Sequence, residues 1–355
     1  MNSKTEWRNV TVEFYKERDR EDYTDFLLND LDSNIYHTIE WKELIEKHFG
    51  FTSYYLIART NSDEIGAVLP VFYLKNLCGK RLDSIPLSIY GGALGEEVYV
   101  KRLVETVFEL KRDLNCRYVI IRQHPNKYYN VFTVKGMKKT DVKWTQMIKI
   151  KNPKILWNEI YKSNRNSIRK AIKNNVRVQE IDDKKELSEF YRLELANRRR
   201  IGLITPPFDF FESAWDELYP QGYMKVFVTR YKEIVIASCL IYIFNGKVIY
   251  AHANSDKRFL GFRPNNLQLW RVIEWCYSNG YELLDLGATD LDNEGLFFFK
   301  SSFNTFNIPF AYYYWPSDSI TIDDTALGKI GKKCIQKTPT FVLKIVCPYL
   351  LKKFG

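Results

Sequence analysis

The feature that most constrains the fold is an internal repeat. Residues 54–74 (YYLIARTNSDEIGAVLPVFYL) have the pattern of a strand, a polar turn and a second strand, and residues 224–244 (MKVFVTRYKEIVIASCLIYIF) repeat that pattern. Runs rich in β-branched and aromatic residues around a short polar turn are typical of a β-hairpin. Glu64 and Glu233 follow the two turns at equivalent places, 169 residues apart. The sequence therefore predicts two copies of one structural unit.

A helix and a further strand follow each hairpin. Helical periodicity covers residues 100–114 and 266–278, and the apolar runs CRYVIIRQ (116–123) and YELLDLGA (281–288) come next. Strands that alternate with helices indicate an α/β fold, in which helices flank mixed sheets.

The chain of 355 residues is longer than one average domain. We expect a first unit in residues 1–150, a second in 151–315 and a basic amphipathic tail in 316–355. Such a tail either packs on the fold or lies on an anionic membrane. Packing is the favoured interpretation, because apolar helices at the ends of domains usually close a core.

The composition is that of a globular protein, with 45% hydrophobic and 27% charged residues. The formal net charge of +10 favours an anionic partner: a phosphorylated small molecule, a nucleotide sugar, an RNA or a membrane surface. A surplus of solvated surface lysines accounts for the same charge equally well.

The cysteines and histidines show no metal-binding pattern. The six cysteines contain no C-x-x-C, and the four histidines lack ligand spacing, so we expect reduced thiols and no metal site. The charged N-terminus lacks the apolar core of a signal peptide. The apolar run near the C-terminus is broken by Lys344 and Pro348 and is too short to span a bilayer. We expect a cytoplasmic protein, with contact to the inner membrane face through the tail as an open alternative.

Five stretches, taken in order, resemble the FemAB/FemX family of tandem GNAT N-acyltransferases. They are HTIEWKELIEKHFGF (37–51), LDSIPLSIYGGAL (82–94), RNSIRKAIKNNVRV (165–178), RPNNLQLWRVIEW (263–275) and LDLGATDLDNEGLFFFKSSFN (284–304). That family transfers aminoacyl or acyl groups to amines of cell-wall precursors. The resemblance implies two GNAT-like units and an acyltransferase that acts on an amine of a glycan, nucleotide sugar or lipid-linked envelope precursor.

The acyl donor stays open between acyl-CoA and aminoacyl-tRNA. GNAT enzymes that use acetyl-CoA usually carry a Q/R-x-x-G-x-G/A loop, whose amides bind pyrophosphate at a helix N-terminus. The nearest match, RFLGFR (258–263), has Arg263 in place of the last small residue. The long helical arm of some Fem enzymes also lacks a counterpart, so the resemblance does not by itself imply tRNA as a partner.

Three residues are the candidates for acyl-transfer chemistry: Lys300, Asp290 and Glu294. The Lys300 ammonium, surrounded by phenylalanines, could neutralise a tetrahedral oxyanion or hold a donor phosphate. Asp290 and Glu294, with Asp292 between them, could accept or orient the amine proton. The alternative for Lys300 is an exposed strand residue, and the alternative for the acids is turn formation.

The candidate substrate-binding residues fall into three groups. A basic helix face suits a phosphorylated acceptor, the start of the next helix suits an anion or amide, and a glycine loop allows close backbone approach. The residues are Arg165, Arg169 and Lys170; Arg263, Asn265 and Asn266; Tyr90 and Gly91. A solvated helix face and a tight turn are the structural alternatives.

A second function from another class remains. A non-catalytic GNAT-like module with this charge could bind RNA or an anionic membrane. The altered CoA-type loop favours that alternative, whereas the acidic loop followed by Lys300 favours the enzyme.

Overall fold

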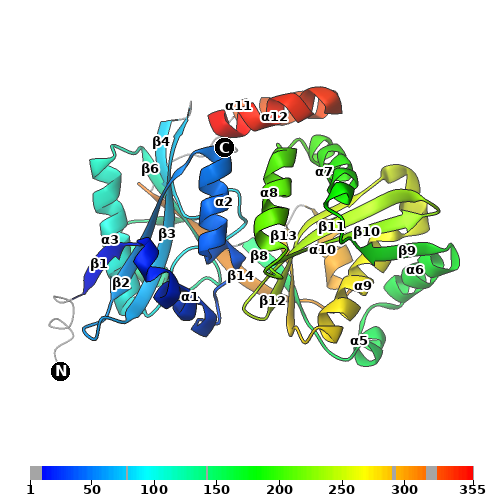
Figure 1. The fold of residues 1–355 in the computed structure, drawn as a ribbon, viewed down its shortest axis with the longest axis horizontal. Helices are drawn as coiled ribbons and strands as arrows, with labels where there is room; N and C mark the ends of the chain where they lie inside the picture. The colour runs from blue at the N-terminus through cyan, green and yellow to red at the C-terminus, as the bar shows by residue number, and fades with distance from the viewer. Residues whose placement is uncertain (1–9, 77–78, 141–142, 290–292, 317–325, 355) are drawn as a thin grey trace. The chain divides into compact units, whose positions relative to one another are not determined.

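The computed structural model describes residues 10–76, 79–140, 143–289, 293–316 and 326–354. The chain divides into two compact units, which are described one at a time (Figure 1). The first contains the described residues up to Lys143 and those of 309–316 and 352–354, and the second contains the described residues of 144–308 and 326–351.

The first unit is built on one mixed sheet. Its strand order is β1-β2-β3-β4-β6-β14, with β5 beside β3 and β7 beside β14. Neighbours are antiparallel except β4 and β6, which are parallel. The strands are β1 Thr11–Phe14, β2 Thr52–Arg59, β3 Ile65–Asn76, β4 Gly79–Asp83, β5 Leu94–Gly95, β6 Tyr118–Gln123, β7 Lys138–Lys139 and β14 Phe306–Trp315.

Helices cover both faces of this sheet. The long helix α3 buries an apolar stripe at Val100, Val104 and Val107 against one face. The other face meets α1 and α2, where the rings of Tyr23 and Tyr55 lie 6.0 Å apart. The α-helices of this unit are α1 Arg20–Asn29, α2 Ile39–Phe49, α3 Glu97–Asp113 and α4 Tyr129–Val134.

The second unit repeats the plan. Its strand order is β8-β13-β12-β11-β10-β9, and the one parallel pair in this order is β12 with β13. Both hairpins expected from the sequence are confirmed, as β2–β3 and β10–β11. The strands are β8 Lys143–Lys149, β9 Val176–Glu180, β10 Met224–Tyr231, β11 Ile234–Phe244, β12 Lys247–Ser255 and β13 Leu283–Thr289.

Residues that alternate along β11 point to opposite faces of this sheet. Cys239 and Ile241 join the core under α9, whereas Leu240 pairs with His252, whose ring meets the aromatic side chains of α7 and α8. The α-helices of this unit are α5 Pro153–Glu159, α6 Lys162–Lys173, α7 Leu187–Ile201, α8 Phe208–Leu218, α9 Pro264–Ser278, α10 Glu294–Ser301, α11 Ala326–Lys337 and α12 Thr340–Phe354.

Local sequence signals explain where the helices begin and end. Pro153 and Pro264 each occupy the first position of a helix, where the missing N–H costs nothing. After α9, Gly280 has a positive φ of 76°, which glycine adopts without strain. The basic segment between the halves forms two helices, α5 and α6, because the chain turns at Ile160 and Tyr161.

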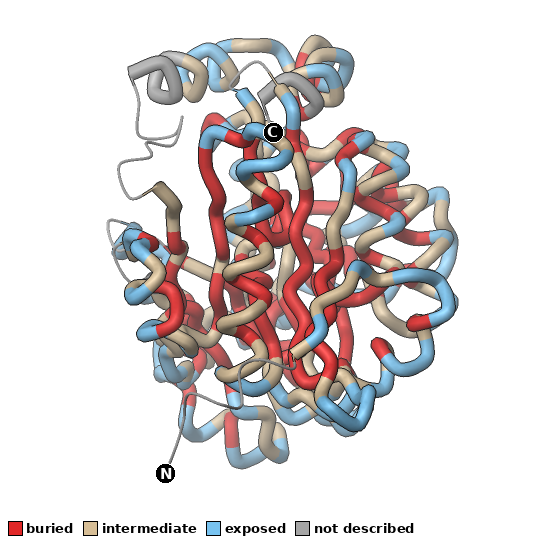
Figure 2. Tube along the Cα trace, turned by 90° about the vertical axis from the view of Figure 1, so that its left-hand side faces the viewer, coloured by how far each residue is buried: buried red, intermediate tan, exposed pale blue. Residues whose placement is uncertain are grey.

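Two strands belong to sheets that a linear division of the chain does not predict. Strand β14 lies in the range expected for the second unit, 151–315, but pairs with β6 and β7 of the first. Strand β8 lies in the range expected for the first unit, 1–150, but pairs with β13 of the second. The α/β fold with mixed sheets is confirmed, and Figure 2 shows its buried segments in red.

Candidate active site

The two parallel strands of the second unit separate after a short paired region. Strand β12 pairs with β13 from Lys247 to Ile249, which lies opposite Asp285. Among the described residues, no pairing continues between segments 250–255 and 286–289, although β11 and β8 remain paired on their outer sides. We call these two segments the open edges. Their inner backbone amides and carbonyls can receive an extended ligand as an added strand would be received.

Both open edges carry a β-bulge. The register of β12 shifts at Ala251, and that of β13 shifts between Asp285 and Ala288. Gly287 supplies the positive φ, 71°, at the second bulge. Bulges bend a strand and redirect its side chains and carbonyls, which here turns the Gly287 and Ala288 carbonyls toward α10.

Lys300 holds that second bulge. It lies in the last turn of α10, is 7% exposed, and donates hydrogen bonds to the carbonyls of Gly287 (2.9 Å) and Ala288 (3.2 Å). The alternative of an exposed strand residue is therefore wrong: the segment is a helix and the amine faces inward. Of the phenylalanines expected to surround it, Phe303 is fully buried, whereas Phe298 is 59% exposed.

Asp285 is a buried carboxyl group beside this amine. It is 4% exposed and accepts a hydrogen bond of 2.7 Å from the Gly287 amide. Burial raises its pKa to about 7, although the Gly287 amide and Lys300 act in the opposite direction. Burial lowers the pKa of Lys300 to about 8, and the charge of Asp285 partly offsets that effect. Two groups that titrate near neutral pH in one place are typical of functional sites.

Side chains from three other elements position α10. The Gln146 amide of β8 donates to the Ser301 hydroxyl (2.9 Å) and the Phe297 carbonyl (3.3 Å). Asn164 of α6 donates to Ser302 (2.8 Å), and Asn266 of α9 donates to Asn164. Asn164 is 2% exposed, so this network is buried. Buried polar networks whose members are paired fix a single arrangement, and this one places Lys300 at the bulge.

Residues 162–300, most of the second unit, match the family model of the GNAT acetyltransferase domain. The solved structure of FemX matches 85% of this chain and 96% of its own chain, with a TM-score of 0.67 and 16% identity. The chain has the FemX-like tandem GNAT fold.

Two further solved structures share this tandem GNAT fold. The C-terminal domain of a protein described as a lysylphosphatidylglycerol synthetase of Agrobacterium fabrum matches with a TM-score of 0.57 at 12% identity, over 90% of this chain and 96% of its own. A tandem GNAT protein from the clavulanic acid biosynthesis pathway matches with 0.53 at 10% identity, over 87% of this chain and 100% of its own. Comparison with curated protein sequences gives no significant match.

The acidic loop before α10 is described only in part. Asp290 and Asp292 lie outside the described residues. Glu294 is the first residue of α10 and is exposed. Its negative charge there stabilises the helix by interacting with the positive end of the helix dipole. Asn293 caps the helix by accepting a hydrogen bond of 3.3 Å from the Leu296 amide. The catalytic roles of Asp290 and Glu294 stay predictions.

The basic face of α6 is used in part to join α5 to α6. Arg165 donates to the carbonyls of Trp157 (3.2 Å) and Ile160 (2.6 Å), and so caps the end of α5. Arg169 is exposed and lies over the Trp157 ring at 5.4 Å, and Lys170 is exposed. Substrate binding by this face remains a prediction, carried by Arg169 and Lys170 more than by Arg165.

The residues at the start of α9 have different surroundings. Arg263 is exposed in a left-handed conformation, with φ 61°. Asn265 donates to the Ser255 hydroxyl at 3.2 Å, at the end of one open edge. Asn266 belongs to the buried network behind α10. Arg263 and Asn265 therefore remain candidates for ligand contact, while Asn266 has a structural partner.

Tyr90 and Gly91 lie in the first unit, in the loop between β4 and β5. Tyr90 is 1% exposed and stacks on His124 at 4.2 Å. The Gly91 amide donates to the Arg122 carbonyl (2.9 Å), and a Cβ at Gly91 would lie 2.2 Å from Ile85. The close backbone approach that the glycines allow is made to the protein itself. Ligand contact by this loop stays a prediction.

One cluster in the GNAT domain was not expected from the sequence. Glu194 of α7 is 1% exposed and accepts hydrogen bonds from Arg198 Nε (2.6 Å) and His252 Nδ1 (3.0 Å). Burial alone would raise the pKa of Glu194, but His252 and Arg198 hold it well below its usual range. His252 lies on the open edge of β12, directly after the bulge at Ala251. A lone histidine in an apolar strand gave no spacing signal, and Glu194 lies 58 residues away in sequence.

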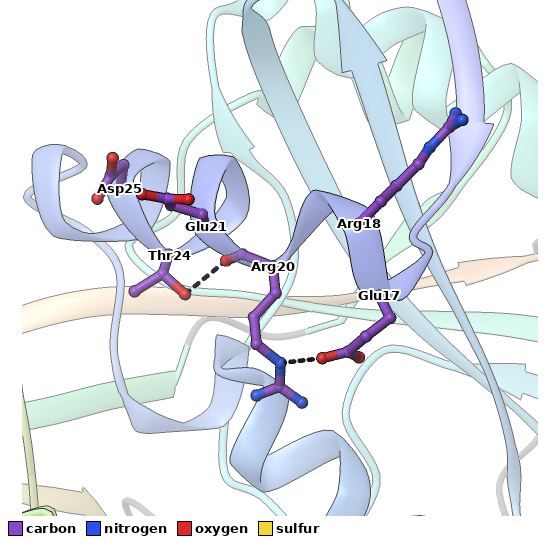
Figure 3. A pocket seen from close by; sticks show the side chains of 6 residues that line it. All are labelled: Glu17, Arg18, Arg20, Glu21, Thr24 and Asp25. Carbon is purple, nitrogen blue, oxygen red and sulfur yellow. Dashed lines mark hydrogen bonds and ion pairs between the residues drawn. The ribbon is translucent and has the colours of Figure 1, made fainter.

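A shallow depression on the first unit is lined by charged residues of consecutive turns (Figure 3). Its lining consists of Glu17, Arg18, Arg20, Glu21, Thr24 and Asp25. Arg20 pairs there with Glu17 at 2.5 Å, so the surface is occupied by its own ion pairs. Since Lys300 and the open edges belong to the second unit, we do not assign this depression to the chemistry.

Within the described ranges, no group of three or more His, Cys, Asp or Glu side chains has the geometry of a metal site. The five cysteines described there are free thiols, and four of them are buried. In the same part of the chain, no helix combines the length and the apolar character needed to cross a bilayer.

Proposed function

We propose that the chain is an N-acyltransferase whose second unit moves an acyl or aminoacyl group onto an amine of a cell-envelope precursor. The observation that carries the proposal is the position of Lys300, a buried ammonium at the bulge of an open edge inside a GNAT acetyltransferase domain. An amine that attacks a thioester or ester produces a tetrahedral oxyanion, and a preorganised cation beside it lowers the barrier.

The open edges are the proposed donor site. An acyl chain with amide groups, or the ester end of an aminoacyl-tRNA, can hydrogen-bond to inner backbone groups of residues 250–255 and 286–289 other than those of Gly287 and Ala288 that already bond to Asp285 and Lys300. Arg263 and Asn265 lie at the end of this region and suit an anionic group of the donor. Both donor classes remain in the proposal and are separated by the test below.

The attacking amine must lose a proton. Asp285, with its pKa raised to about 7, is one acceptor within the site. His252 is the other, because Glu194 fixes its Nδ1–H and leaves Nε2 as the nitrogen that can take a proton. We assign the base to Asp285 or His252 in preference to Glu294, which is exposed at the start of α10.

The acceptor class rests on the chemistry of the chain and on its neighbours. The net charge of +10 and the exposed Arg169 and Lys170 suit a phosphorylated precursor. One neighbour by fold is FemX, and another carries in its name an aminoacylated lipid. These likenesses support an envelope precursor as the acceptor without identifying the molecule.

One observation favours the second candidate, a non-catalytic GNAT-like module that binds RNA or an anionic membrane. Two of the three N–H donors of Lys300 are already taken by the bulge carbonyls, as a structural role would require.

The test is a ligand panel followed by transfer. Thermal unfolding is measured with acetyl-CoA, longer acyl-CoAs, aminoacyl-tRNA and nucleotide sugars, since a bound ligand raises the unfolding temperature. We expect one donor class to stabilise the chain and to support acylation of an amino sugar or aminolipid, read by mass spectrometry. A chain that ignores every donor and binds RNA alone would replace the enzyme proposal with the second candidate.

A further inference from the structure

We propose that helix α12 docks the protein on an anionic lipid bilayer through a stripe of three large side chains. The stripe consists of Phe341, Ile345 and Tyr349, which are 71%, 75% and 62% exposed. They are spaced four residues apart and so share one face of the helix. This inference does not depend on the acyltransferase proposal, because binding to a surface needs no chemistry.

The opposite face of α12 is attached to the second unit. Leu343, Cys347 and Leu351 are 2%, 1% and 6% exposed. The Cys347 thiol contacts the backbone of Thr205, which lowers its pKa, although burial raises it overall. One face of α12 is thus buried, and the exposed stripe lies on the opposite face.

Helix α11 is attached in the same unit. Gln336 donates a hydrogen bond of 3.2 Å to the Arg200 carbonyl at the end of α7. A Cβ at Gly202 would lie only 2.8 Å from the Lys332 carbonyl oxygen, so the two backbones pack closely. The fold therefore holds the tail in place and presents the stripe outward, without the ordering cost of a free peptide.

The charge of the tail selects the partner. Residues 326–355 contain seven lysines and no acidic residue, whereas the other 325 residues carry a net charge of only +3. Lys333, Lys337 and Lys344 are exposed on α11 and α12. Each lysine near an anionic membrane strengthens binding about fivefold, and aromatic side chains favour the interface. Apolar side chains among lysines are the composition of an interfacial helix.

A second copy of the chain fits the stripe less well. A stable protein interface buries about 800 Å² on each partner, which is more than three side chains supply. A symmetric dimer would also bring the lysines of one tail against those of the other. A soluble RNA would satisfy the lysines but gives no reason for Ile345 to be exposed.

The test is co-sedimentation of the full chain, without acyl donor, with two kinds of vesicle. One kind contains phosphatidylglycerol in phosphatidylcholine, and the other contains phosphatidylcholine alone. We expect binding to the anionic vesicles that falls at high salt, and weak binding to the neutral ones. A variant carrying Phe341→Ser, Ile345→Ser and Tyr349→Ser should bind at least tenfold less at unchanged thermal stability.

The matched control removes equally exposed apolar side chains elsewhere. Leu31→Ser with Val134→Ser changes residues that are 83% and 79% exposed in the first unit and should leave binding unchanged. If the triple variant unfolds, Ile345→Ser should weaken binding and Ile345→Phe should strengthen it. Equal binding by the triple variant and the wild type would overturn the proposal. The proposal would also be overturned if the triple variant abolished a dimer or an RNA complex of the protein but left vesicle binding unchanged.

Discussion

Replacing Lys300 with methionine tests whether its ammonium serves chemistry or structure. Methionine keeps the length of the stem and removes the charge. At neutral pH the buried charge of Lys300 destabilises the folded state, since its pKa is about 8 rather than 10.5. That difference corresponds to about 3 kcal/mol, which Lys300→Met relieves.

The substitution also removes two hydrogen bonds. The carbonyls of Gly287 and Ala288 lose their donor. Leaving a buried carbonyl unpaired costs about 1–3 kcal/mol, so two cost about 4 kcal/mol. The two effects nearly cancel, and we expect Lys300→Met to lower the free energy of unfolding at pH 7 by only about 1 kcal/mol. For a unit of this size that is a shift of about 2–4 °C in the unfolding temperature.

The same pKa gives the sign of the pH dependence. Between pH 8 and 10.5 the unfolded wild type binds the Lys300 proton while the folded wild type releases it. Its free energy of unfolding therefore rises through this range relative to the methionine variant. Denaturant unfolding of both proteins across this range measures the difference, in which all other titrating groups cancel. A constant difference would refute the lowered pKa.

Activity separates the two roles of Lys300. If the ammonium stabilises an oxyanion, Lys300→Met should reduce kcat by about 100- to 1000-fold. The control is Lys154→Met, which removes an exposed lysine of α5 and should leave the rate unchanged. A folded Lys300→Met variant with full activity would refute the catalytic assignment. A loss of more than about 5 kcal/mol, with unchanged activity per folded molecule, would make Lys300 a structural residue.

Three more substitutions test the surroundings. Asp285→Asn should raise the free energy of unfolding at pH 8 by up to about 4 kcal/mol, because the folded carboxyl has a raised pKa. For the same reason, the free energy of unfolding should fall less between pH 4 and 7 in the variant than in the wild type. An unchanged denaturant profile would contradict this. Glu194→Gln should cost about 3 kcal/mol at pH 7, and the cost should shrink as acid protonates Glu194 in the unfolded wild type, which acid titration of both proteins can check. Gly91→Ala should destabilise the first unit by about 1–3 kcal/mol, because its Cβ meets Ile85 at 2.2 Å; an unchanged unfolding temperature would show that the loop can shift.

The repeated elements could be read from the sequence because each leaves a local signal. The hairpins show turn residues between apolar strands, and Pro264 and Gly280 mark the ends of α9. The partners of β8 and β14 could not be read in this way. An apolar strand sequence predicts burial but does not indicate which sheet the strand joins. These two strands join sheets whose other strands are distant in sequence.

The site was only partly predictable for a related reason. The position of Lys300 after an acidic loop drew attention to it, but its hydrogen bonds depend on the bulge at Gly287, which has no sequence signature of its own. Arg165 has the positive charge expected of a phosphate-binding residue, but it caps α5 by donating to backbone carbonyls. His252 and Glu194 meet only because α7 packs on β12, so neither residue alone predicted the pair.

Each unit contains one short parallel strand pair, and the two units differ in what lies beyond it. In the first, β4 and β6 pair in parallel from Arg81 to Asp83, a three-residue match like that of β12 with β13. Beyond Asp83 the chain stays on β6: the Ser84 amide donates to the Ile120 carbonyl, and Gly91 forms a bridge to Gln123.

The Arg122 side chain secures that loop in the first unit. It binds Asp83 through two hydrogen bonds, of 2.9 and 2.8 Å, and the Ser88 carbonyl through a third. The position equivalent to the open edges is thereby filled by the protein's own backbone. Backbone that is already paired cannot receive a ligand as an added strand, so this difference supports the second unit as the proposed donor site. Lys300, Asp285 and His252 all belong to that unit.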